Sequence, residues 1–176
     1  SEAGISKFDN AGSTSQRGVE ALLAVKLIDN PRKFLSGLNL RTALTYHDFQ
    51  FKNYIKNTED ENVDFSGNDL TGTSPFIAVS SIDIDFSFGG YLYVSHNFTD
   101  AIPLDDANTV YAQNYHLVTA KMGWKFEGKN NLNIYAGVDN LLDQKYSLGN
   151  DLNAFGNRYF EPSPARNYYF GINLYF

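Results

Sequence analysis

Residues 76–88 have the sequence Phe-Ile-Ala-Val-Ser-Ser-Ile-Asp-Ile-Asp-Phe-Ser-Phe, in which polar and apolar side chains alternate from Ser81 onward. One face carries the apolar members, namely Phe76, Ala78, Ile82, Ile84, Phe86 and Phe88. The other face carries the polar members, namely Ser81, Asp83, Asp85 and Ser87. Because side chains alternate between the two faces of a strand, this pattern predicts a strand with one apolar face. Two aspartates on one face would repel each other in a dry core, so that face is expected to meet a water-filled lumen or bulk solvent.

The same two-residue period recurs in both directions from this stretch, whereas a helical period is nearly absent. Further strands are expected at about residues 19–27, 38–46, 91–97, 118–126, 132–139 and 167–176. Aromatic residues, almost all of them Tyr and Phe, make up 15% of the chain and favour strands. We therefore predict an all-β fold, an antiparallel meander of about seven strands.

The connections between these strands alternate in length. Three are short turns, near Asn30, Gly89 and Gly128. Three are polar stretches too long for hairpin turns, at about residues 56–74, 100–112 and 147–165. Outer-membrane barrels have this asymmetry, with short periplasmic turns and long extracellular loops. Because single-chain bacterial barrels have even strand numbers, about seven strands are not expected to close a barrel alone.

The composition argues against several classes of function. The chain contains no cysteine, which excludes disulfides, thiol nucleophiles and thiolate metal sites. Its formal net charge is −6 and no basic face is visible, so nucleic-acid binding is not expected. The three histidines, His47, His96 and His116, lie on different predicted strands without metal-ligand spacing, and no G-x-S-x-G context marks a nucleophile. We predict no catalytic residues, no metal site and no cofactor.

Three stretches of the chain resemble motifs of TonB-dependent receptors. Residues 10–12 (N-A-G) followed by residues 16–20 (Q-R-G-V-E) resemble an N-x-G…x-R-G-x-E strand. Residues 138–146 (V-D-N-L-L-D-Q-K-Y) are similar to a v-x-N-L-f-D-k-x-Y segment near the C-terminus of that family. Residues 164–171 resemble its P-G-R-x-y-x-x-G run, with Ala165 where the family usually has glycine.

This resemblance implies that residues 1–176 are the C-terminal portion of a larger transmembrane barrel of about 22 strands. The plug domain and the N-terminal strands would lie upstream of Ser1. The implied protein is integral to the bacterial outer membrane and imports a large scarce nutrient, most often an iron-siderophore complex, without catalysis. Its implied partners are outer-membrane lipid, the nutrient, the TonB-ExbB-ExbD system acting through the plug, and the barrel-assembly machinery. That machinery would recognise the last strand through Tyr169, Gly171, Leu174 and Phe176.

Aromatic residues on the long loops are the candidates for ligand contact, namely Tyr111, Phe155, Tyr159 and Phe160. Such side chains can form stacking platforms, although they can equally pack one loop against another. The loop acids, including Asp105 and Asp106, are expected to be solvated charges. Asn140 and Asp143 are expected to bond nearby backbone where the strand ends, and Arg166 to make hydrogen bonds or ion pairs at the rim.

Three alternative functions remain open from the sequence. The first is a glycan importer of the same superfamily that works with a surface lipoprotein. The second is a soluble all-β carbohydrate-binding module, which would fold without detergent but would leave the alternating loop lengths unexplained. The third is a barrel enzyme, for which the residues provide no positive indication.

Overall fold

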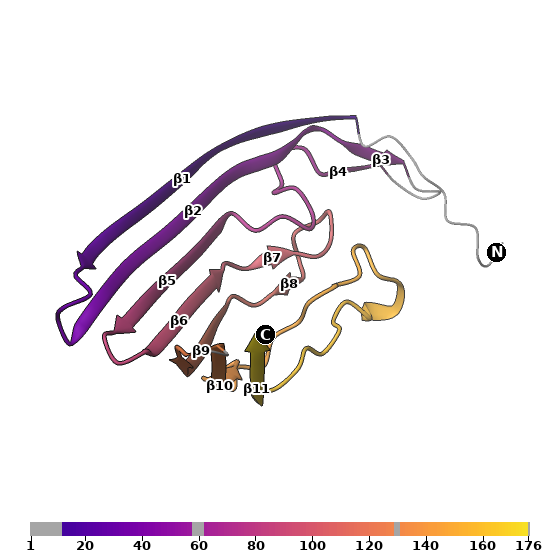
Figure 1. Ribbon diagram of the computed structural model, residues 1–176. Coiled ribbons are helices and arrows are strands. Elements are labelled where there is room, and N and C mark those ends of the chain that lie inside the picture. Colours follow the sequence, from indigo (N-terminus) through magenta and orange to yellow (C-terminus); the bar gives the residue numbers. More distant parts are fainter. Residues whose placement is uncertain (1–11, 58–61, 129–130, 176) are drawn as a thin grey trace.

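The computed structural model describes residues 12–57, 62–128 and 131–175 (Figure 1). Within these residues, seven strands form one antiparallel sheet in the order β1-β2-β5-β6-β9-β10-β11. Their bounds are β1 (Ser13–Asp29), β2 (Leu35–Asn53), β5 (Phe76–Phe86), β6 (Gly90–Thr99), β9 (Tyr115–Phe126), β10 (Asn131–Asp139) and β11 (Asn167–Tyr175). Each strand pairs with the next long strand along the chain, which confirms the predicted all-β meander. Asn10, Ala11 and Phe176, which belong to the terminal motifs, lie outside the described residues.

The strands end at places that side-chain alternation alone does not indicate. β2 continues past Tyr46 to Asn53, because its backbone keeps pairing with β1 as far as Ser13. β5 ends at Phe86 rather than at Phe88, because the chain turns there and Gly89 adopts a φ of +89°.

Secondary structure also occurs inside the stretches that we predicted to be loops. One short pair is β3 (Ile55–Asn57) with β4 (Asn62–Asp64), and a second is β7 (Ile102–Pro103) with β8 (Tyr111–Ala112). A 3-10 turn, η1 (Phe155–Asn157), lies in the third long connection. These short elements make the long connections more ordered than their polar composition indicates.

Two neighbouring rows of side chains illustrate the division between the faces of the sheet. One row is in register across all seven strands and is wholly aliphatic or aromatic: Val25, Leu40, Ile82, Val94, Ala120, Val138 and Tyr168. The row beside it points to the opposite face and is mostly polar: Lys26, Asn39, Asp83, Tyr93, Lys121, Gly137 and Tyr169. These two surfaces are named the apolar face and the polar face below.

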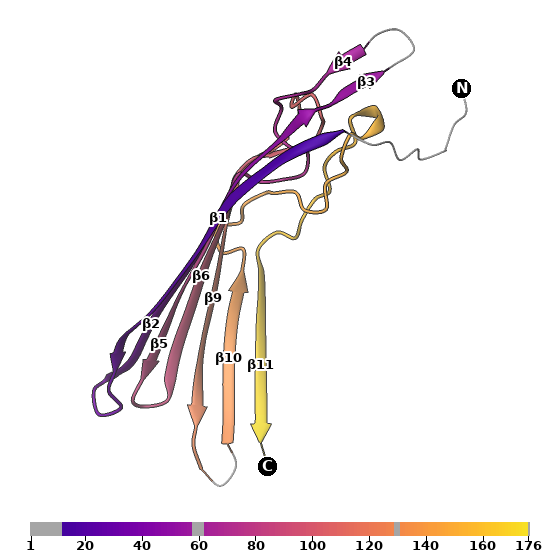
Figure 2. The same cartoon turned by 90° about the horizontal axis from the view of Figure 1, so that it is seen from above.

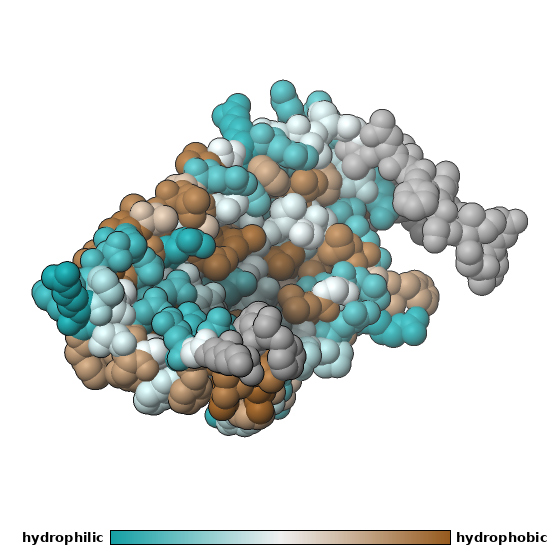
Figure 3. Space-filling model, in the orientation of Figure 1, coloured by the Kyte–Doolittle hydropathy of each residue, from teal (hydrophilic) through white to brown (hydrophobic). Residues whose placement is uncertain are grey.

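The sheet is a curved wall that is open along both edge strands, β1 and β11 (Figure 1). The long connections gather at one end of the wall with β3 and β4, and the short turns lie at the other end (Figure 2). In the space-filling view, hydrophilic residues gather in the hollow of the wall and hydrophobic residues lie along its outer margin near β9–β11 (Figure 3). An open edge strand leaves backbone hydrogen-bonding groups unpaired, so β1 and β11 can each pair with a further strand.

Buried hydrophobic residues lie only at the long-loop end, within the described part of the chain: Phe51, Leu104, Ala112, Tyr115 and Tyr159. Many large side chains on the apolar face are instead exposed, for example Met122 and Phe170, at 62% and 67%. A continuous exposed apolar surface of this kind is typical of a membrane-embedded or interacting surface. None of the described helical segments is long and apolar enough to span a membrane.

Aromatic rings cluster at both ends of the apolar face. At the short-turn end, successive ring centroids lie between 4.7 and 5.9 Å apart along Phe34, Phe86, Phe88, Trp124 and Phe126. At the loop end, Phe76 packs against Phe98 at 6.0 Å.

The spacing between these two aromatic clusters can be estimated along β5. Phe76 and Phe86 lie at its two ends, and the strand has 11 residues. With a rise of about 3.3 Å per residue and a tilt of about 40°, the rows are about 25 Å apart, the height of the apolar band of outer-membrane barrels.

Candidate functional site at the loop end

A small hydrophobic core joins the long connections to one another. Leu104, Ala112 and Tyr159 are its buried members, and the partly buried residues packed against them are Ile102, Val110 and Ala154. These residues come from the connection between β6 and β9 and from the connection between β10 and β11. We name this cluster the loop core. It holds two loops that are distant in sequence in one fixed arrangement.

Asp106 joins the connection between β2 and β5 to the two connections that form the loop core. Its carboxylate accepts hydrogen bonds from the Tyr54 hydroxyl at 3.0 Å, the Thr71 hydroxyl at 2.6 Å and the Asn153 amide at 3.0 Å. The Asp106 amide donates to the Asn153 side chain at 3.0 Å, and its carbonyl accepts from Asn68 at 2.8 Å. Asp106 is only 8% exposed, so our expectation that it is a solvated charge is wrong. The three long connections therefore form a single hydrogen-bonded platform.

Asp105 stabilises the turn beside this platform. Its carboxylate accepts hydrogen bonds from the Thr109 hydroxyl and from the backbone amides of Thr109 and Val110, the latter two at 2.8 and 3.0 Å. Partial burial opposes ionisation, but these hydrogen bonds outweigh it and lower the pKa of Asp105 below its ordinary value. Asp105 is therefore a charged structural group, rather than a freely solvated one.

The four candidate ligand-contact residues occupy different environments. Tyr159 is buried in the loop core, and its ring lies 6.4 Å from that of Phe160. Phe155 is 90% exposed on the 3-10 turn and Phe160 is 55% exposed. Tyr111 is half-buried in β8, where burial and the charges of Asp69 and Asp105 raise its pKa. Phe155 and Phe160 are thus the candidates whose rings are available to a ligand.

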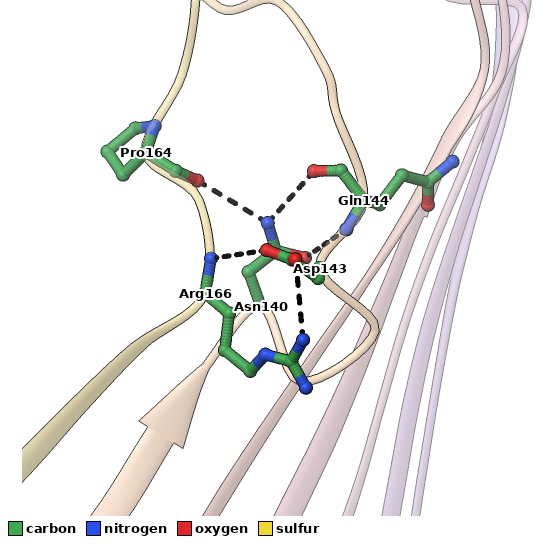
Figure 4. Close-up of polar contacts among 5 residues, drawn as sticks. All are labelled: Asn140, Asp143, Gln144, Pro164 and Arg166. Atoms are coloured by element: carbon green, nitrogen blue, oxygen red, sulfur yellow. Dashed lines mark hydrogen bonds and ion pairs between the residues drawn. The ribbon is translucent and has the colours of Figure 1, made fainter.

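The predicted contacts of the C-terminal motifs are present in the structure (Figure 4). The Asn140 amide donates to the carbonyls of Gln144 and Pro164 at 2.9 and 3.4 Å, and its oxygen accepts from the Gln144 backbone amide at 2.9 Å. Asp143 accepts from the Arg166 backbone amide at 3.0 Å and forms an ion pair with the Arg166 guanidinium at 3.3 Å. We name these five residues the β10–β11 clasp. They confirm the prediction of backbone bonding and a rim ion pair.

Two features of the clasp explain its residue types. Asn140 adopts a φ of +50°, a conformation that asparagine tolerates better than most residues. The pKa of Asp143 is lowered, first by the hydrogen bond from the Arg166 backbone amide, and further by the positive charges of Arg166 and Lys145. The clasp closes the base of the loop that carries Phe155 and Phe160.

Tyrosine rings cover glycines on the polar face of the last strands. A Cβ atom at Gly171 would lie 2.3 Å from the Tyr135 ring, and one at Gly137 would lie 2.3 Å from the Tyr169 ring. These residues are cross-strand partners, Tyr135 with Gly171 and Gly137 with Tyr169. Two of the predicted assembly-signal residues, Tyr169 and Gly171, thus also have a packing role. Leu174, a third, lies on the apolar face and is 47% exposed.

A shallow groove on the polar face brings acidic, basic and aromatic side chains together, among them Asp83, Asp85, Tyr91, Tyr93, Lys121 and Lys125. The Lys125 ammonium lies 5.0 Å from the Tyr91 ring centroid, and the Lys121 ammonium lies 5.9 Å from both the Tyr93 and Tyr135 rings. A hydrated surface accommodates such a mixture, in keeping with the expectation for the face that carries Asp83 and Asp85.

The histidines are arranged differently from what their sequence spacing indicates. His47 lies 3.2 Å from the Ser74 carbonyl. His96 and His116, however, meet across neighbouring strands, with Nε2 of His96 at 2.9 Å from Nδ1 of His116. The pairing of β6 with β9 produces this contact, and only knowledge of that register could have predicted it.

Comparison with known proteins identifies the family. A family model described as TonB dependent receptor-like, beta-barrel matches residues 2–141. The chain belongs to this family. The chain is therefore part of an integral β-barrel of the bacterial outer membrane, and in such barrels the outward face is apolar and the interior is polar. This location excludes the soluble binding module that the sequence left open.

Three solved structures of receptors and transporters share the fold. The siderophore receptor PiuA from Acinetobacter baumannii superposes with a TM-score of 0.70 at 17% identity. The alignment covers 92% of this chain and 22% of PiuA. The ferric citrate transporter FecA superposes with a TM-score of 0.71 at 18% identity. The alignment covers 92% of this chain and 24% of FecA. BauA, the ferric preacinetobactin receptor from Acinetobacter baumannii, superposes with a TM-score of 0.59 at 14% identity. The alignment covers 93% of this chain and 27% of BauA. The chain thus spans about a quarter of the length of these receptors.

Proposed function

We propose that this chain is the C-terminal part of the barrel of a TonB-dependent transporter that imports an iron-siderophore complex. The observation that carries the proposal is the platform at the loop end, where Asp106 and the loop core fix three connections and leave Phe155 and Phe160 exposed. Rigid aromatic groups can stack on planar or apolar parts of a ligand at little entropic cost. The structural neighbours are named as a siderophore receptor, a ferric citrate transporter and a ferric preacinetobactin receptor, and they support iron as the cargo.

The proposed mechanism is binding followed by energised passage, with no bond broken. The ligand would bind at the platform and pass through the lumen, along the charged polar face. The TonB-ExbB-ExbD system would supply the energy through a plug domain, and outer-membrane lipid would cover the apolar face. None of these steps requires a catalytic residue or a cofactor from this chain.

Uptake of radiolabelled ferric siderophore by cells that carry the whole receptor tests this proposal. Cells with the intact gene should accumulate iron, whereas cells that lack either the receptor or TonB should not. Combined replacement F155A/F160A should raise the apparent Kd about 10-fold or more, since each stacked ring contributes roughly 1 kcal/mol. Phe34→Ala is the matched control, because Phe34 is also largely exposed, at 70%, but lies at the short-turn end.

Glycan import is the second candidate, and the same cells distinguish it. Uptake of a labelled oligosaccharide, with no TonB-dependent iron uptake, would refute the siderophore proposal and retain the transporter class. Failure to transport either ligand in a TonB-dependent manner, by a receptor correctly inserted in the outer membrane, would contradict both.

A further inference from the structure

One row of side chains on the polar face is almost wholly aliphatic. It is in register across five strands and consists of Leu22, Ala43, Val79, Asn97 and Leu117. Val79 lies four residues from Asp83 on β5, so the row shares the face that carries the charged groove. Leu22 and Val79 are both exposed. Contiguous exposed apolar side chains on an otherwise polar surface are a common sign of a binding surface. We name these five residues the inner apolar row.

The surroundings of the inner apolar row change along the strands. The next row toward the short-turn end is mostly small and polar: Ala24, Arg41, Ser81, Ser95 and Thr119. The next row toward the loop end contains Ile77 and ends at Tyr115, whose ring lies 5.0 Å from that of Tyr146. Further along β2, on the same face, the His47 ring stacks on Phe49 at 4.4 Å. Aliphatic groups on the polar face therefore lie toward the loop end, next to the long connections.

This position places the inner apolar row between the loop-end platform and the charged groove. Val79 and Asp83 are separated by about 13 Å along β5, at a rise of about 3.3 Å per residue. Cargo that moved from Phe155 and Phe160 along the polar face to the groove would pass this row. A wholly polar cargo would lose hydration there without compensation, whereas an apolar substituent would be stabilised by burial. The exposed rings of the platform and the inner apolar row thus favour the same kind of cargo.

We propose that the inner apolar row binds an apolar substituent of the cargo. The transported ferric complex is then amphiphilic, with an acyl or aryl group in addition to its polar iron-binding groups. Leu22, Val79 and Leu117 contact that group after it leaves the platform. This inference rests on the proposed function, and it names the class of cargo.

Matched pairs of ferric complexes test the proposal in the whole receptor, inserted in lipid nanodiscs. The two members of a pair share their iron-binding groups and carry either an acetyl or a hexanoyl substituent. One pair each is built on a hydroxamate, a catecholate and a citrate chelator. The hexanoyl member of a bound pair should bind at least about 10-fold more tightly, since each of its four additional methylenes contributes about 4-fold when fully buried.

Replacement of two members of the row by threonine should remove this preference. In V79T/L117T the ratio of the two apparent Kd values should fall below about 3-fold, while the affinity for the acetyl member stays unchanged. The matched control is V94T/L92T, which makes the same two replacements on the apolar face. It should retain the wild-type ratio, and it controls for partition of the hexanoyl group into lipid.

Equal affinity of the wild type for both members of every bound pair would overturn the proposal, as would an undiminished ratio in V79T/L117T. Equal weakening of both members by V79T/L117T would indicate that another part of the receptor covers the row, and would overturn it as well. If the double variant fails to insert, Val79→Thr alone permits the same comparison.

Uptake of iron from the same pairs, by cells with and without TonB, separates this inference from the proposed function. Absence of TonB-dependent iron uptake from every pair would refute the proposed function and the inference with it. TonB-dependent uptake without a preference for the hexanoyl member would overturn the inference alone.

Discussion

Leu104 in the loop core is completely buried, whereas Met122, in the middle of the sheet, has 62% of its surface exposed. The two side chains are similarly apolar, so the difference lies in what surrounds them. The loop end buries its apolar groups against its own residues and satisfies Asp106 internally. The sheet leaves its apolar face exposed and has open edges at β1 and β11. One chain thus contains a region that is stabilised from within and a region that is stabilised by its surroundings.

This contrast has a functional consequence. A platform that is held by its own core can present Phe155 and Phe160 in a fixed position even though it projects from a membrane wall. The wall needs only backbone hydrogen bonding, a lipid-compatible face and a hydrated lumen. Substitutions in the two regions should therefore have different energetic costs for the same chemical change.

The largest effect is expected from Leu104→Ala, measured in the whole receptor in lipid nanodiscs. Removal of a fully buried leucine leaves a cavity, which should reduce the local stability of the loop end by about 2–5 kcal/mol. Amide hydrogen exchange across residues 100–114 and 150–160 measures this change. Leu44→Ala, on the lipid-facing side of β2, is the matched control. Because lipid can fill the vacated space, its cost should be clearly smaller, and equal costs would contradict the contrast.

Gly171→Ala, in the middle of β11, is expected to have a smaller effect. The new methyl group would meet the Tyr135 ring, and displacing that ring should cost about 1–3 kcal/mol of barrel stability. Urea unfolding in detergent measures the loss. In the double variant G171A/Y135S the smaller side chain leaves room, so most of the loss attributable to crowding should be recovered.

That double variant also separates two roles of Gly171. If poor insertion of Gly171→Ala persists in G171A/Y135S, the glycine is required by the assembly machinery. If insertion recovers, glycine is needed at position 171 because the Tyr135 ring packs closely against it.

Sequence alternation predicted the sheet well because the period of two is a local property of each strand. It could not predict the platform, because Asp106 bonds to Thr71 and Asn153, which are 35 and 47 residues away. An acidic residue in a polar stretch has the same local pattern whether it is solvated or buried. The His96–His116 contact was missed for a related reason, since it depends on the register between two strands joined by a long connection. The clasp was predictable because its motifs are local and match a family pattern.

The smallest effect is expected at the clasp, as a function of pH. The folded structure lowers the pKa of Asp143, so the carboxylate stabilises the clasp above its ordinary pKa of about 3.9 and loses this contribution as the pH falls through the lowered value. The Arg166 backbone amide donates a hydrogen bond to Asp143. Its hydrogen exchange, corrected for intrinsic rates, should therefore accelerate below about pH 4. The Gln144 amide donates to the non-titrating Asn140 and serves as the internal control. Equal acceleration at both amides would indicate that the whole loop opens on acidification. The Asp143–Arg166 pair would then not stabilise the clasp independently of the Asn140 contacts.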